Sequence, residues 1–222
     1  MPERFQSALT DALRVWRIEP SEEQVRLLEG HFKAVLEANR RFNLTRVTEP
    51  VEAAVTLYAD SVSVAVWAVQ AGVRVRAVLD GGTGAGFPAV PVAVMQPRWQ
   101  VTAADSTAKK ADFVSACARD LRIRNLTAVH SRVEHLQRPP VYELVLFKAV
   151  SKIDECLTWS QHVVARGGHV VLYKTPTIPP EEEAAGQRTA GRLGYREVDR
   201  FDYALRHGGE TLARVLRVFR RE

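Results

Sequence analysis

From residue 73 onward, short apolar runs alternate with stretches whose apolar residues recur at helical spacing. Two parallel strands need a crossover between them, usually a helix, because the chain must return before the next strand begins. Repeated alternation therefore predicts a doubly wound α/β fold, a mostly parallel sheet with helices on both faces. The predicted strands lie at about residues 76–79, 99–104, 126–130, 142–147 and 169–173, and the predicted helices at about residues 88–95, 108–121, 152–164 and 180–193.

The first 70 residues lack this alternation and read as helical throughout. Ser21–Gln24 is a capping box that opens one helix. A second helical stretch follows, interrupted at Asp60-Ser61 and ending at Ala71-Gly72. We expect two parts, a helical extension over residues 1–72 and the α/β domain over residues 73–222.

After the last predicted helix, the chain carries two further β-like runs, at about residues 195–203 and 211–219. The segment His207-Gly208-Gly209 between them is a turn signal. Together they predict an antiparallel hairpin at one edge of the sheet. The arginines of Arg217–Arg221 alternate with apolar residues, so we expect their charges on an exposed strand face.

The composition fits a soluble protein with one sizeable core: 46% of the 222 residues are hydrophobic and 26% are charged. The longest near-apolar run, Val62–Val69, is far shorter than the roughly 20 residues of a membrane-spanning helix. The start of the chain lacks the apolar stretch of a secretory signal. Cys117 and Cys156 form no CxxC pair, so we expect buried thiols rather than a disulfide or a metal site. We predict a cytoplasmic protein that holds no metal and contacts no membrane.

Positive charge is concentrated in the second part of the chain. The net charge is +5, with 25 of the 31 basic residues being arginine. Residues 1–70 carry a net charge of −2, so residues 71–222 carry +7. A basic domain suits a polyanionic partner such as RNA. The alternative is an arginine-rich composition with no functional meaning.

The segment Leu79–Pro88 (LDGGTGAGFP) lies between a predicted strand and a predicted helix, where a nucleotide-binding loop is found. Its spacing is GxGxG, with Phe87 where a dinucleotide loop needs glycine, which disfavours an NAD-dependent oxidoreductase. No Lys-Ser/Thr pair follows, so the loop is not a phosphate-binding P-loop. A tight glycine turn without a phosphate-binding device suits a ligand without phosphate, such as S-adenosylmethionine. The alternative is a structural turn with no ligand.

Two neighbouring strand ends carry further candidates for the same ligand. Asp105 ends the second predicted strand, where an acidic side chain can accept both ribose hydroxyls. Its alternative role is to cap the helix that follows. The third strand ends at His130–Glu134, which places a backbone amide and an apolar side chain where an adenine would lie.

The chain resembles the RsmG family, also called GidB, bacterial enzymes that methylate N7 of a guanine in 16S rRNA. Asn39–Thr45 (NRRFNLT) with Asp60-Ser61 is similar to the family's N-terminal signature, and Asp80–Pro91 (DGGTGAGFPAVP) to its cofactor loop. Asp105–Phe113 (DSTAKKADF) and Ser131–Glu134 match its next two motifs. The resemblance implies a Rossmann-like methyltransferase domain, S-adenosylmethionine as cofactor, and 16S rRNA or the small ribosomal subunit as partner. It places Gly82, Phe87, Val133, Glu134 and Lys148 at the family's cofactor contacts.

Several positions depart from the family pattern. Lys148 stands in Phe147-Lys148-Ala149, where the family usually has Ser-Arg-Ala, and it lacks the planar fork of arginine. Leu57 replaces a usual histidine, Ala89 a glycine, and Tyr173–Thr175 a Leu-Lys-Gly. We expect these departures to affect which RNA site is recognised more than they affect binding of the cofactor.

Guanine N7 carries a lone pair and no proton, so its methylation needs no general base, and the protein has to orient and desolvate the reactants. We predict Lys148 as a catalytic anchor near the transferred methyl group or the target base. Its alternative is a salt bridge at the end of a strand. The full set of predicted cofactor residues is Asp80, Gly82, Gly84, Gly86, Phe87, Asp105, Val133, Glu134 and Lys148.

RNA contacts are expected from side chains around the mouth of the cofactor cleft. They are Arg40, Asn43, Lys109, Lys110, Arg132 and Lys174. Asn43 has the alternative role of capping a helix end. For Lys109 and Lys110 the alternative is a solvated helix face.

We expect a monomer. Two other functions stay open at this point. One keeps the cofactor and changes the acceptor to another RNA or a non-RNA molecule. The other is a ribosome-associated nucleotide-binding protein that has lost catalysis.

Overall fold

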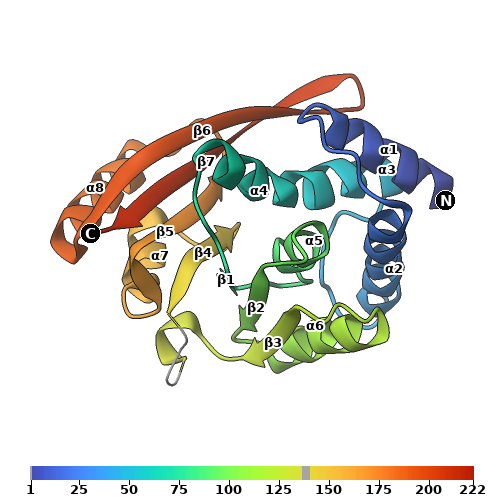
Figure 1. Cartoon of the computed structure of the whole chain (residues 1–222), viewed down its shortest axis with the longest axis horizontal. Coiled ribbons are helices and arrows are strands. Elements are labelled where there is room, and N and C mark those ends of the chain that lie inside the picture. The colour runs from blue at the N-terminus through green and yellow to red at the C-terminus, as the bar shows by residue number, and fades with distance from the viewer. Residues whose placement is uncertain (1, 137–140) are drawn as a thin grey trace.

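A computed structural model describes residues 2–136 and 141–222 of the chain (Figure 1). The strands are β1 (Ala77–Gly81), β2 (Gln100–Asp105), β3 (Leu126–His130), β4 (Tyr142–Lys148), β5 (Val164–Lys174), β6 (Tyr195–His207) and β7 (Glu210–Arg221). The helices are α1 (Pro2–Arg14), α2 (Glu22–Asn39), α3 (Pro50–Ala53), the π-helical segment η1 (Ala54–Ala59), α4 (Asp60–Gln70), α5 (Ala89–Met95), α6 (Ala108–Asp120), the 3-10 turn η2 (Val133–His135), α7 (Ile153–Ser160) and α8 (Pro180–Leu193).

All seven strands form one sheet, in the order β3-β2-β1-β4-β5-β7-β6. Strands β1 to β5 pair in parallel, whereas β7 runs antiparallel to both of its neighbours and β6 forms the edge. The predicted doubly wound sheet with an antiparallel C-terminal hairpin is confirmed. Because β1 lies between β2 and β4, the connections from β1 and β4 leave in opposite directions, which opens a crevice at the carboxyl ends of these strands.

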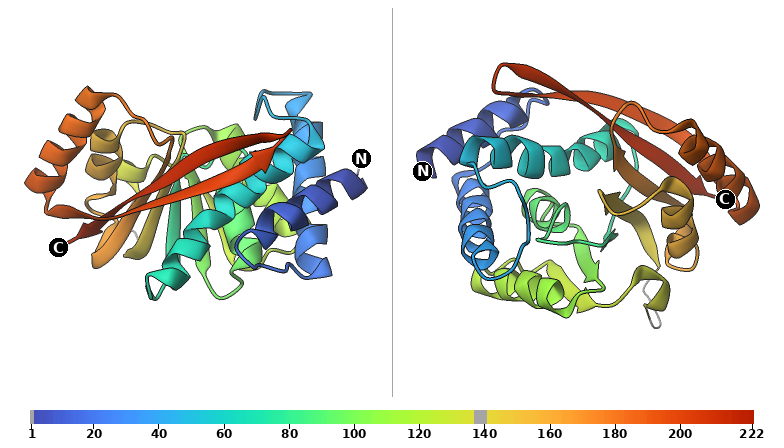
Figure 2. Two further views of the ribbon diagram at one scale, coloured as in Figure 1. Left: turned by 90° about the horizontal axis from the view of Figure 1, so that it is seen from above. Right: turned by 180° about the vertical axis from the view of Figure 1, so that it is seen from behind.

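Helices cover both faces of the sheet (Figure 2). Adjacent residues of a strand point to opposite faces, so Val78 joins the core beneath α1–α6 and Leu79 joins the core beneath α7 and α8. The first core also contains Phe5, Leu9 and Tyr58 from the N-terminal helices. These helices therefore bury their apolar faces against the same side of the sheet as α5 and α6.

The predicted capping box is present at the start of α2, where Ser21 and Gln24 each accept the other's backbone N–H. The expected interruption at Asp60-Ser61 was wrong, since the chain stays helical from Pro50 to Gln70. The hydroxyl of Ser61 donates to the carbonyl of Leu57 inside the helix, so it does not break it. This 21-residue stretch is long and apolar enough to cross a membrane, but 78% of its most apolar window is buried inside the protein.

Two predicted boundaries were also wrong. The helix expected to reach residue 164 ends at Ser160, because the N–H of Tyr142 donates to the carbonyl of Val163 (2.9 Å) and Val164 already belongs to β5. Arg166 and Gly167-Gly168 separate this start from the apolar run at residues 169–173, which hid the first part of the strand in the sequence. The register of β4 against β5 shifts at the same place.

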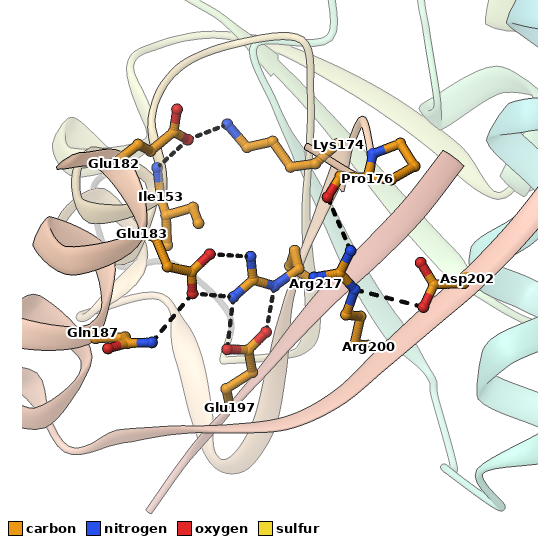
Figure 3. A network of polar contacts seen from close by, with 10 residues as sticks. All are labelled: Ile153, Lys174, Pro176, Glu182, Glu183, Gln187, Glu197, Arg200, Asp202 and Arg217. Atoms are coloured by element: carbon orange, nitrogen blue, oxygen red, sulfur yellow. Dashed lines mark hydrogen bonds and ion pairs between the residues drawn. The ribbon is translucent and has the colours of Figure 1, made fainter. Parts of the chain in front are cut away.

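Arg217 corrects the prediction that the tail arginines are exposed. Its side chain is only 5% exposed. The guanidinium donates to both carboxylate oxygens of Glu183 on α8, each at 2.7 Å, and also pairs with Glu197 on β6 (Figure 3). Arg217 therefore fastens α8 to the antiparallel edge of the sheet, since a buried charge is stable only when it is paired and hydrogen-bonded.

Candidate functional site

A pocket of about 190 Å³ lies at the carboxyl ends of the central strands. It is lined by Gly81, Gly82, Ser106, Ser131, Arg132, Val133, Glu134, Phe147, Val150 and Trp159. These residues come from the ends of β1 to β4, from η2 and from α7. Ligands bind at this position in open parallel sheets, because loops from several strands converge there.

The glycine loop after β1 forms one wall of this pocket. The N–H groups of Gly82 and Thr83 donate to the carbonyl of Ala104 on β2, at 2.8 and 3.0 Å. A Cβ on Gly81 would lie 2.5 Å from the Phe147 ring, and Gly82 has φ = +74°. Side chains here would fill the pocket or strain the backbone, so the loop needs glycine at both positions. This cradle fits a nucleoside that approaches the backbone closely.

Asp105 holds the glycine loop against the end of β2. One carboxylate oxygen accepts the N–H of Gly84 (2.9 Å), and the other accepts the N–H of Thr107 (2.8 Å). Thr107, not Asp105, is the N-cap of α6, and the Thr107 side chain makes no capping hydrogen bond. The alternative role of Asp105 as a helix cap was therefore wrong. Its predicted contact with a ribose stays a prediction.

Asp80 is fully buried beneath the loop at the end of β1. Its Oδ2 accepts the N–H of Ala89 (3.1 Å), whereas Oδ1 has no hydrogen-bond partner among the described residues. Burial raises the pKa of this carboxyl to about 7. The group can therefore change its charge when a cation or a hydrogen-bond donor arrives nearby.

The N-terminal helices support the other side of the glycine loop through His31, on α2. Its Nε2 lies 2.9 Å from the carbonyl of Ala85, and its Nδ1 lies 2.8 Å from the hydroxyl of Tyr58. A carbonyl can only accept, so Nε2 carries the proton and Nδ1 accepts from the tyrosine. Burial lowers the pKa of His31 to about 4, so the ring is neutral. Sequence reasoning missed His31, because a single histidine in an amphipathic helix carries no local signal.

Phe87 packs against Tyr58 and His31 and does not line the pocket. Its ring lies 5.0 Å from that of Tyr58 and 5.4 Å from that of His31, both edge-on. Gly84 and Gly86 do not line the pocket either, so the cofactor contacts predicted for these three residues stay predictions.

Lys148 ends β4, and its ammonium lies 3.0 Å from Oδ2 of Asp60. It also donates to the carbonyl of Thr56 in η1 (3.3 Å), and its side chain is 12% exposed. The hydroxyl of Tyr203 donates to the other oxygen of Asp60 (2.7 Å). The salt bridge considered as the alternative role is present, and Lys148 does not line the pocket. Its predicted catalytic and cofactor roles stay predictions.

The predicted RNA-contacting residues fall into two groups. Arg132 lines the pocket, and Lys109, Arg40 and Asn43 are exposed, with Lys110 half-buried on α6. Lys174 differs, because its ammonium donates to Glu182 (2.7 Å; Figure 3). It also donates to the carbonyl of Ser151 (2.8 Å). An RNA contact by Lys174 would require this network to open.

The end of α2 is organised by Asn39 rather than by Asn43. The Asn39 side chain accepts the N–H groups of Leu44 and Thr45 and donates to the carbonyl of Thr45. The capping role considered for Asn43 was therefore wrong, and Asn43 stays exposed.

Both cysteines are buried free thiols as predicted, and burial raises the pKa of Cys117 and of Cys156 to about 12.

Comparison with protein families identifies this arrangement. The family GidB, described as rRNA small subunit methyltransferase G, matches residues 24–200. The chain belongs to this family. The match begins in α2, passes through the glycine loop and the pocket-lining residues, and ends in β6.

Individual members of the family resemble the chain over most of its length. Ribosomal RNA small subunit methyltransferase G from Solibacter usitatus is 33% identical over 186 residues, which cover 83% of this chain and 87% of that protein. The protein of the same name from Deinococcus deserti is 37% identical and covers 81% of this chain and 75% of its own length. The family predicted from the sequence motifs is confirmed.

Solved structures share the fold at low sequence identity. A precorrin-6y C5,15-methyltransferase from Geobacter metallireducens matches with a TM-score of 0.51 and 16% identity, covering 66% of this chain and 80% of that one. TYW2 from P. horikoshii, solved in complex with MeSAdo, matches with a TM-score of 0.52 and 15% identity, covering 65% of this chain and 56% of that one. The Rossmann-like methyltransferase fold is confirmed.

Six pocket residues were not assigned individually from the sequence: Gly81, Ser106, Ser131, Phe147, Val150 and Trp159. The first four lie at or just after the ends of parallel strands, so the rule that ligands bind at carboxyl ends would have found them. Trp159 comes from the last turn of α7 and reaches the pocket only because α7 packs beside β4. No local pattern marks it.

Proposed function

We propose that this protein transfers the methyl group of S-adenosylmethionine to N7 of a guanine in 16S rRNA of the small ribosomal subunit. The observation that carries the proposal is the pocket at the carboxyl ends of β1 to β4, closed by a glycine cradle, in a member of the rRNA small subunit methyltransferase G family. The names of the relatives support the acceptor, and the glycine cradle supports a nucleoside cofactor.

The pocket residues suit the parts of the cofactor. Val133, Phe147 and Trp159 offer an apolar slot for the adenine, and the backbone of Gly81 and Gly82 leaves room for the ribose. Asp105 and Glu134 supply acceptors nearby for hydroxyl or amino groups. When bound, the cofactor supplies a methyl group activated by a positively charged sulfur.

The protein's remaining task is to position the guanine. The N7 lone pair forms the new bond to carbon as the bond from carbon to sulfur breaks, and no proton leaves N7. No side chain therefore needs to act as a base, and orientation and exclusion of water account for the catalysis. Lys148 acts as an anchor near the base, held by Asp60, and Arg132, Lys109, Lys110, Arg40 and Asn43 contact the RNA around it.

In this proposal, residues 73–222 form the cofactor-binding domain, and residues 1–72 form a helical extension that supports the glycine loop through His31. The protein works as a cytoplasmic monomer on the small-subunit RNA.

The test is methyl transfer from labelled S-adenosylmethionine to small-subunit RNA that lacks the modification, offered naked and assembled with its proteins. Reduction and aniline cleavage then map 7-methylguanine. Cleavage at one guanine supports the proposal. Transfer without such cleavage moves the target to another atom, and cofactor binding without any transfer contradicts the proposed activity. A variant with Gly82→Val, whose side chain would enter the pocket, serves as the inactive control.

A further inference from the structure

A row of arginines lies where β1, β2 and β3 begin, at the end of these strands opposite the pocket. Arg76 immediately precedes β1, Arg98 lies two residues before β2, and Arg124 two residues before β3. Backbone hydrogen bonds join these starts, from the N–H of Gln100 to the carbonyl of Arg76 (2.6 Å) and from the N–H of Val101 to the carbonyl of Asn125 (2.8 Å). Because neighbouring strands are about 4.8 Å apart, the three arginines follow one another closely.

Three more arginines extend this row. Arg74 precedes Arg76, Arg122 precedes Arg124, and Arg119 lies in the last turn of α6. We call the six residues the arginine edge: Arg74, Arg76, Arg98, Arg119, Arg122 and Arg124. All six are exposed.

The positive charge of the arginine edge is poorly balanced. Arg119 pairs with its neighbour Asp120 (2.9 Å). Glu143, at the start of β4, accepts the backbone N–H groups of Arg76 and Ala77 instead of pairing with a guanidinium. Within residues 2–136 and 141–222, the other five arginines of the edge form no salt bridge. A row of like charges repels itself and attracts a polyanion.

The surface around Arg122 and Arg124 is hollowed on two sides. One groove, of about 510 Å³, is lined in part by Ser115, Arg119 and Thr127. A second, of about 360 Å³, is lined in part by Gln100 and Asn125. Arg122 and Arg124 line both grooves. Guanidinium groups beside hydroxyls such as those of Ser115 and Thr127 are donors that bind phosphate oxygens, whereas the Asn125 amide already donates to the carbonyls of Ala93 and Trp99.

Arg122 also has an unusual backbone. Its φ is +57°, in the left-handed region just after α6, where glycine is the preferred residue. A residue with a Cβ pays roughly 1 kcal/mol in this conformation. Replacing Arg122 with glycine therefore removes the guanidinium and relieves this strain, so the change should not destabilise the fold.

The arginine edge and the pocket cannot contact the same nucleotide. Strands β1 to β3 lie between them, and five or six residues of strand span roughly 17–20 Å. We infer that the arginine edge binds the phosphate backbone of a second segment of the RNA whose guanine enters the pocket. This inference rests on the proposed function and adds to it that the protein recognises folded rRNA rather than an isolated target sequence.

The experiment compares a triple variant, R98Q/R122G/R124Q, with the wild type on two RNAs. One is the full-length small-subunit RNA, and the other is a short RNA with only the target guanine and its near neighbours. We expect KM for the long RNA to rise about tenfold, and the slope of log affinity against log salt to fall by about two, because three phosphate contacts are lost. The kcat, and the KM for the short RNA, should not change.

The matched control is Arg17→Gly. Arg17 is exposed and has the same φ of +57°, but it follows α1, away from the arginine edge. This variant removes one positive charge and the same backbone strain as Arg122→Gly, and it should bind and methylate both RNAs like the wild type. Thermal unfolding of Arg122→Gly should show no loss of stability, so a binding defect cannot come from unfolding.

Equal KM values for the triple variant and the wild type on the long RNA would overturn the inference, and so would equal losses on both RNAs. A wild type that binds phosphatidylglycerol vesicles through these arginines, with RNA affinity unchanged in the variant, would also overturn it in favour of a membrane. If the wild type methylates neither RNA, the proposed function fails, but the salt slope of RNA binding still decides the inference. A lower slope in the triple variant alone would support it, and identical slopes would refute it.

Discussion

The ammonium group of Lys148 and the carboxylate of Asp60 form a nearly buried ion pair, 3.0 Å apart, that joins the end of β4 to the start of α4. Both side chains make a further hydrogen bond, Lys148 to the carbonyl of Thr56 and Asp60 to the hydroxyl of Tyr203. The pair therefore links three parts of the chain: the N-terminal helices, the strand next to the pocket and the C-terminal hairpin. The residue predicted to anchor the target base is thus positioned by a carboxylate from the N-terminal helices.

Removing one partner of this pair should be costly. We expect Lys148→Met to lower the free energy of unfolding by about 3 kcal/mol, because it leaves a buried carboxylate without its counter-charge. The double variant K148M/D60N should recover much of this loss, and urea unfolding of the four proteins measures the coupling. An exposed pair would give a coupling below about 1 kcal/mol, so strictly additive effects would contradict the burial described here.

The neutral state of His31 predicts a dependence of stability on pH. Its pKa is about 4 in the folded protein and 6.5 in the unfolded chain, so only the unfolded chain gains a proton between these values. Above pH 6.5, His31 makes its full contribution to the free energy of unfolding. This contribution decreases by roughly 3 kcal/mol as the pH falls toward 4. The difference in unfolding free energy between wild type and His31→Gln should therefore shrink over this range. The wild type has to be compared with the variant at each pH, because the buried Asp80 makes the fold more stable as the pH falls, whereas His31 makes it less stable. Subtracting the two unfolding free energies removes the effect of Asp80. A difference that stays constant from pH 7.5 to pH 4 would show that His31 is not held neutral.

Asp80 predicts a pH dependence of cofactor binding. Its pKa is about 7 in the free protein, so the carboxyl is partly protonated at neutral pH. A sulfonium bound beside the glycine loop favours the ionised form, so binding should release up to one proton and tighten as the pH rises toward and beyond 7. Calorimetry in two buffers with different ionisation enthalpies counts the protons. Asp80→Asn should abolish the release, and an unchanged release in this variant would assign the proton to another group.

Two glycines of the loop provide a matched pair for testing the pocket. Both Gly82 and Gly84 have positive φ, so alanine strains the backbone at either position. A Cβ on Gly82 would lie 2.9 Å from the side chain of Val150 in the pocket wall, whereas a Cβ on Gly84 meets nothing within 4 Å. We expect Gly82→Ala to weaken cofactor binding tenfold or more, and Gly84→Ala to lose about 1 kcal/mol of stability with a much smaller change in affinity. Equilibrium binding and thermal unfolding separate the two effects, and equal affinities would place the cofactor away from Gly82.

Much of the fold could be predicted because its signals are local. The strand ends, the glycine turn and the capping box at Ser21 are set by periodicity and turn chemistry within a few residues. Errors fell where tertiary contacts override a local pattern. Asp60-Ser61 reads as a break, but its polar groups find partners inside the helix and on distant elements. Arg217 reads as exposed, but α8 brings Glu183 over it.

The amino-acid sequence by itself determined the α/β alternation, the glycine loop and the family, since each depends on residue types at short spacings. Only the tertiary structure decided that His31 supports the loop 54 residues away, that Lys148 is held by Asp60, that Trp159 reaches the pocket, and that arginines from three separate strand starts form one edge. These relationships depend on how the helices pack against the sheet and on the order of its strands. Packing of this kind is set by the summed burial of apolar side chains across the whole chain, which no short window of sequence contains.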